Sequence, residues 1–252
     1  MAAGLAGAIL ELRRPREPIA WRCPEYWSLG LSALAWLPLT VVTMGSDRPH
    51  QHLTATAVGS VGSWSASWGH PLLAWSLMVV AMMPPLAIAP LRVTASRSLW
   101  ARRDRAVACF MFGFLGLWLL TGTAAVGFAA LATHVVSQTG LLAATGFGIA
   151  AAWQLTPAKA RAIVACHATA PLSLSGWRAD LDCVRYGWRI GKSCLVSCWA
   201  MMTACVLAGH GLVAAVCIGV VAISERTAFR PNQRLFSATL GGLALLYATG
   251  LL

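Results

Sequence analysis

Seven apolar stretches, separated by polar or basic segments, fill the chain from residue 27 to its end. A helix that crosses the hydrocarbon core of a membrane takes about 20 mainly apolar residues. The pattern predicts an all-α fold, a polytopic membrane helix bundle with one transmembrane domain over residues 27–252. The predicted spans are 27–44, 71–91, 106–131, 139–155, 190–208, 212–224 and 235–252, with a basic segment at 1–26 and a cytoplasmic connection at 156–189.

The basic residues are confined to alternate connections. Of the 19 lysines and arginines, 17 lie in the N-terminal segment or in the connections after the second, fourth and sixth spans, Lys192 lies at the cytoplasmic start of the fifth span, and the exception is Arg48. Because cytoplasmic loops are enriched in Lys and Arg, we expect seven spans, with the N-terminus inside and the C-terminus outside. The formal net charge of +11 then serves orientation, so we expect membrane lipid as a partner and no nucleic acid.

The composition supports a membrane protein and reduced cysteines. Hydrophobic residues make up 58% of the chain and charged residues 11%, whereas soluble domains are roughly one quarter charged. Eight cysteines in a long apolar chain are not typical of the disulfide framework of a small secreted domain. We therefore expect free thiols or metal thiolates.

Two of the predicted spans carry stripes of sulfur. The second contains WSLMVVAMMPP, with Met78 and Met82 one helical turn apart and Met83 beside them, and the fifth contains GKSCLVSCWAMM, with Cys194, Cys198 and Met201 on one face. If the two faces meet, thioethers and thiolates would select Cu(I), or zinc if enough thiolates or imidazoles join. The alternative is that these side chains only fill the core.

Three segments, in this order and spacing, resemble a known family. They are WSLMVVAMMPP at 75–85, WQLTPAKARAIVACHATAP at 153–171 and GKSCLVSCWAMM at 191–202. The chain is similar here to the bacterial family of uncharacterised proteins described as predicted metal-binding integral membrane proteins. The resemblance implies a multi-pass protein of the bacterial inner membrane, with signature positions at Met82, Met83, Gln154, Lys159, Cys166, Cys194 and Cys198.

The sequence departs from that family pattern at two thiols. Ala162 stands where the family usually has the first of two cysteines after Q-L-T-P-x-K, and Cys166 is followed by His167 instead of arginine. The adjacent cysteine pair of the family appears as Ser197-Cys198. His167 could replace a missing ligand, or it could simply be solvated at the membrane interface.

Other candidates for chemistry are weaker. Met44, His50 and His52 could chelate a metal at the outer face, or belong to a polar loop. A haem is disfavoured because no c-type attachment motif is present. Glu225 and Arg226 are interpreted as an interfacial anchor. The sequence shows no Ser-His-acid set, no paired intramembrane carboxylates and no phosphate loop, so an enzyme is not indicated.

The favoured hypothesis is a membrane protein that binds a soft metal, copper first, between spans two and five for storage, delivery or sensing. Arg189 and Lys192 would offset the negative charge of a Cu(I) dithiolate. The alternative is a non-catalytic accessory subunit of a larger membrane complex, with other membrane subunits as partners. A third hypothesis is a transporter of metal or of a small solute.

Overall fold

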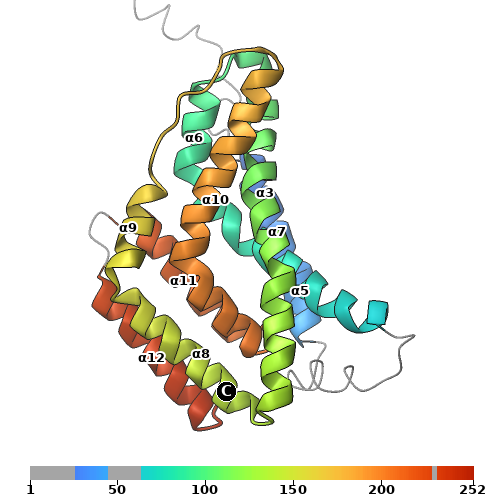
Figure 1. Cartoon of the computed structure of the whole chain (residues 1–252), viewed down its shortest axis with the longest axis vertical. Helices are drawn as coiled ribbons and strands as arrows, with labels where there is room; N and C mark the ends of the chain where they lie inside the picture. Colours follow the sequence, from blue (N-terminus) through green and yellow to red (C-terminus); the bar gives the residue numbers. More distant parts are fainter. Residues whose placement is uncertain (1–25, 45–63, 229–231) are drawn as a thin grey trace, which may run out of the picture.

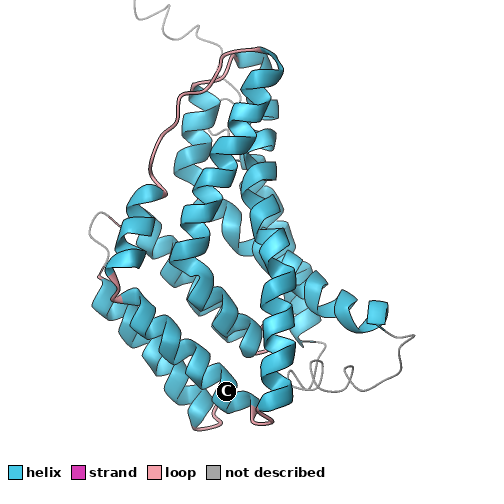
Figure 2. Cartoon of the chain, in the orientation of Figure 1, coloured by secondary structure: helices cyan, strands magenta, loops and turns pink. Residues whose placement is uncertain are grey.

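The computed structural model describes residues 26–44, 64–228 and 232–252, and these residues form helices joined by short connections (Figure 2). No strand occurs within these ranges. One 3-10 turn covers Trp100–Arg102. The α-helices are α3 (Tyr26–Met44), α5 (Trp64–Leu86), α6 (Ile88–Ser96), α7 (Arg103–Val135), α8 (Thr139–Gln154), α9 (Pro157–Ala165), α10 (Gly176–Leu207), α11 (Leu212–Thr227) and α12 (Gln233–Ala248).

Each of the seven predicted segments is helical, but two differ in their limits. The segment predicted at 71–91 is divided between α5 and α6, which are bent by 64° relative to each other. The bend follows Pro84 and Pro85, which lack backbone donors. Helix α10 begins at Gly176, well before the predicted start at residue 190, because its first half carries charged residues that a search for apolar stretches leaves out.

The prediction of seven membrane-spanning helices is wrong for the described part of the chain. There, α7 and α10 are long and apolar enough to cross a membrane, and the bent pair α5–α6 makes up to three. Helices α8, α11 and α12 have 16 residues each, about 24 Å at a rise of about 1.5 Å per residue. A hydrocarbon core is about 30 Å thick, so these helices are too short to cross it.

Helices α7 and α10 form the long axis of the bundle and run side by side in the same direction (Figure 1). Glycines allow their backbones to touch. A Cβ atom added at Gly113 would lie 2.2 Å from the carbonyl oxygen of Val184, and one at Gly187 would lie 2.0 Å from that of Phe110. Any larger residue would force the two helices apart.

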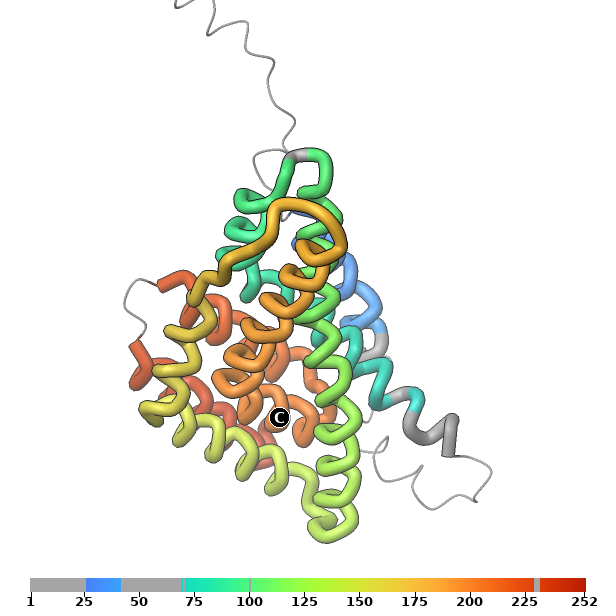
Figure 3. Tube along the Cα trace, turned by 45° about the horizontal axis from the view of Figure 1, so that its top comes forward, coloured from blue at the N-terminus to red at the C-terminus, as the bar shows by residue number. Residues whose placement is uncertain are grey.

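A second pair, α8 and α12, packs side by side next to this axis (Figure 3). The Ser237 hydroxyl of α12 donates to the carbonyl oxygen of Ala151 in α8 at 2.9 Å. Helix α8 also packs on α10, and so does the short helix α9. Helix α11 contacts α3, α5 and α10. The ends of α8, α9 and α11 are thereby brought to the middle of α10.

Candidate metal centre

The QLTPAK segment forms the turn between α8 and α9. Gln154 is the last residue of α8, and Thr156 caps α9 by accepting a hydrogen bond from the backbone nitrogen of Lys159 at 3.3 Å. Pro157 occupies the first helical position, where its missing N–H is not needed. This local chemistry fixes Lys159 in the first turn of α9, and its side chain is buried.

Lys159 forms an ion pair with Glu225 near the end of α11. The Nζ and Oε1 atoms are 3.0 Å apart and both side chains are 1% exposed. The Gln154 side chain contacts the Glu225 carboxyl group, and its Nε2 donates to the sulfur of Met201 at 3.6 Å. Buried charges are costly unless they are paired, so this polar cluster ties α8, α9, α10 and α11 together.

Three thiols lie next to the ion pair. Cys194 and Cys198 are one turn apart on α10 and both are buried. Cys166 caps the end of α9, is also buried, and lies against Ser197 and Cys198. We call Cys166, Cys194 and Cys198 the thiol cluster.

The three side chains of the thiol cluster do not converge as the ligands of one bound metal ion would. Among the described residues, no group of three or more His, Cys, Asp or Glu side chains is arranged to hold a metal ion as it stands. The pair on α10 is therefore the better-formed part, and Cys166 is an adjacent third thiol. Burial raises the pKa of Cys166 to about 11, against an opposing effect of Arg226. The Cys166 thiol is thus protonated at neutral pH.

Arg226 is the cation that faces the thiol cluster. Its Nη2 donates to the hydroxyl of Ser197 at 3.1 Å, and that hydroxyl is 3.4 Å from the sulfur of Cys198. Ser197, which replaces a cysteine of the expected pattern, links the guanidinium to the thiols. The interpretation of Glu225 and Arg226 as an interfacial anchor missed this role. The available signal was two adjacent charges at the end of an apolar helix.

The cations predicted to balance a metal dithiolate lie elsewhere. Arg189 donates to the backbone carbonyl of Thr169 at 2.8 Å and lies over the ring of Tyr186. Lys192 is exposed and lines a shallow surface pocket that also includes Ala162. Lys159 and Arg226 take the places that the sequence interpretation gave to these two residues.

The predicted methionine ligands are divided between two places. Met201 contacts Gln154 beside the ion pair. Met78, Met82 and Met83 are buried, but α5 packs mainly on α3, α7 and α11 and has sparse contacts with α10. A Cβ atom added at Gly219 of α11 would lie 3.6 Å from the Met82 methyl group. Met82 of α5 therefore packs against α11.

The predicted histidine ligands are not gathered at the thiol cluster. His167 is exposed, and its Nδ1 is 3.0 Å from the carbonyl oxygen of Ile163 in its own helix. His50 and His52 lie outside the described residues, and the side chain of Met44 does as well. The proposed metal site at the outer face stays a prediction.

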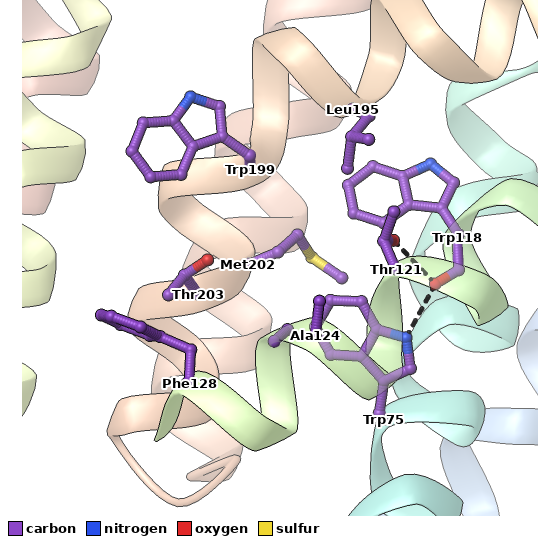
Figure 4. A pocket seen from close by; sticks show the side chains of 10 residues that line it. Trp75, Trp118, Thr121, Ala124, Phe128, Leu195, Trp199, Met202 and Thr203 are labelled. Carbon is purple, nitrogen blue, oxygen red and sulfur yellow. Dashed lines mark hydrogen bonds between the residues drawn. The ribbon is translucent and has the colours of Figure 1, made fainter. Parts of the chain in front are cut away.

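A pocket that includes none of the three thiols is lined by side chains of α5, α7 and α10 (Figure 4). It has a volume of about 300 Å³ and lies between α5, α7 and α10. Trp75 and Thr121 both donate to the carbonyl oxygen of Trp118 at 3.0 Å, and the sulfur of Met202 points toward the two indole rings. No Cys, His or acidic side chain lines this pocket, so it offers a metal ion only a thioether.

The described residues form a helical protein with three buried thiols next to a buried ion pair. The chain belongs to the PpoB2 family, described as copper chaperones, whose family model matches residues 72–251. This match supports copper, but the description differs from that of the predicted metal-binding integral membrane proteins. No curated protein and no solved structure matches the chain.

Proposed function

We propose that the protein is a membrane-embedded copper chaperone that holds Cu(I) between Cys194 and Cys198. The observation that carries the proposal is this pair of buried thiols one helical turn apart, with the third buried thiol of Cys166 beside it. Thiolates select Cu(I) among the common metal ions. Structural zinc sites have four ligands in a tetrahedron, and the thiol cluster supplies fewer, so zinc is the weaker candidate.

Delivery requires that the bound ion leave through exchange of ligands. Cys166 is the natural first acceptor, because it caps α9 where the connection to α10 begins. A copper–sulfur bond to the α10 pair would be replaced by one to Cys166, whose proton passes to the thiolate that is released, and then by a bond to a soft donor of the recipient. The recipient is a protein partner that takes up copper, and this role replaces a purely structural accessory one.

The exposed surface supports insertion into a membrane, with lipid as the covering partner. Large apolar side chains are exposed along α7, among them Phe112 at 74% and Val135 at 79%. Such a surface on a soluble protein would be a large apolar patch. Helices α7 and α10 run in the same direction, and each begins near arginines, so both would cross from the cytoplasmic side of a bacterial inner membrane.

The test is copper binding by the purified full-length protein in detergent. Protein reduced and loaded anaerobically with Cu(I) is desalted, and copper per chain is measured by elemental analysis. We expect about one retained ion in the wild type and almost none in Cys194→Ser/Cys198→Ser. Cys205→Ser is the matched control, because Cys205 is buried on the same helix beyond the thiol cluster, and it should retain copper.

Two results would contradict the proposal. Equal and low copper in the wild type and in the double variant would exclude the α10 pair as a copper site. Metal-free wild type that copurifies with a stoichiometric membrane partner would instead favour the accessory subunit of a larger complex.

A further inference from the structure

We propose that Arg226 is a specificity-determining residue that makes the α10 thiol pair selective for a monovalent metal ion over a divalent one. This inference rests on the proposed function of the thiol cluster in holding copper. It adds a physical reason for the choice of metal that the chemistry of sulfur alone does not supply, since thiolates also bind Zn(II) and other soft divalent ions.

The first step is the charge of the site without metal. The ion pair of Lys159 and Glu225 contributes no net charge. That sum is the same if a proton moves from the lysine to the carboxylate, so it does not depend on the protonation state within the pair. Arg226, which is always protonated in proteins, therefore leaves one positive charge beside the thiols, next to Ser197 and Cys198.

Among the described residues, no acidic side chain forms a salt bridge that would neutralise the charge of Arg226. In the described ranges, the salt bridges join Arg102 and Arg105 to Asp180 and Lys159 to Glu225, and none includes Arg226. Arg226 donates instead to the neutral hydroxyl of Ser197, and its nearest ionisable neighbours are the thiols of the cluster. A partly buried cation without an anion favours the arrival of negative charge.

The second step is the charge that each metal brings. When a metal ion binds the α10 pair, both thiols lose their protons to solvent and no electron is transferred. Two thiolates with Cu(I) carry one negative charge, which cancels the charge of Arg226. Two thiolates with a divalent ion carry none, so the charge of Arg226 remains unbalanced. In a site of low dielectric constant this difference is large.

The experiment compares Cu(I) with Cd(II), a soft divalent probe, on full-length protein in detergent. Affinities are measured by competition with chelators for Cu(I) and by thiolate-to-metal absorption for Cd(II). In Arg226→Met the guanidinium charge is gone, so Cu(I), whose dithiolate is an anion, should bind more weakly, whereas the affinity for Cd(II), whose dithiolate is neutral, should change little. We expect the ratio of the two affinities to fall by about 100-fold, as for one nearby unit charge in a protein interior.

Arg226→Lys is the matched control, because it keeps the charge and should keep the ratio within about threefold. If Arg226→Met does not fold, Arg226→Gln removes the same charge and keeps a donor for Ser197. A variant without the charge that binds Cu(I) with an unchanged ratio overturns the inference. Wild-type protein that binds no copper at all overturns the proposed function instead, so the two failures are distinct.

Discussion

The two sides of α10 bury sulfur equally well but surround it differently. Toward α9 and α11, Cys194 and Cys198 lie beside Ser197, Arg226 and an ion pair. Toward α5 and α7, Met202 lies among indole rings and aliphatic groups. The difference teaches that buried sulfur becomes a candidate metal site through its polar neighbours. Charges can stabilise a thiolate, whereas an apolar wall cannot.

The largest effect is expected from a substitution on the polar side of α10, in its buried ion pair. Replacing Glu225 with alanine leaves Lys159 buried without its partner, and we expect a loss of about 3–5 kcal/mol of stability, as for other broken buried pairs. The measurement is thermal or denaturant unfolding of the protein in detergent. Lys159→Met/Glu225→Met removes both charges and should cost much less. Equal losses in the two variants would show that the ion pair itself contributes little.

A smaller effect is expected from a substitution at the close contact between α7 and α10, which supports both sides of α10. Gly187→Ala places a methyl group 2.0 Å from the carbonyl oxygen of Phe110, and we expect a loss of about 1–3 kcal/mol from overpacking. Gly148→Ala is the control, because an added Cβ there meets no atom within 4 Å. Unfolding curves that coincide for Gly187→Ala and the wild type would contradict the close crossing.

The smallest effect is expected in the methionines of α5. The triple variant Met78→Leu/Met82→Leu/Met83→Leu conserves volume, so each change should cost less than about 1.5 kcal/mol. Because Met82 packs against α11 and the proposed site uses only the thiols of α10, copper per chain should stay at the wild-type value in elemental analysis. Loss of copper without loss of folding would restore the predicted site between the second and fifth spans.

The sequence predicted the helices better than their lengths. Apolar stretches located every helical segment of the predicted bundle, because burial in a core or in lipid demands the same residues. They did not show that α10 continues back to Gly176, since that half is amphipathic and charged. They also did not show where short helices end, which depends on local chemistry such as the Thr156 cap.

For the candidate site, the sequence located the candidate ligands but not the side chains that surround them. A helical period showed that Cys194 and Cys198 share a face, and the resemblance singled out Gln154, Lys159 and Cys166. Neither showed which helix that face meets. The pairing of Lys159 with Glu225 joins residues far apart in the chain, and such a contact follows from how helices pack, which no local pattern records.

The glycine contacts between α7 and α10 also have a mechanical consequence. Backbone atoms are in close contact at Gly113 and Gly187, so the two helices are expected to move together. Sliding one helix past the other would first require the two backbones to separate. The position of the α10 thiols beside α7 is therefore fixed. Under the proposed function, the movement that releases copper would come from the short helix α9 and the end of α11, which pack against α10.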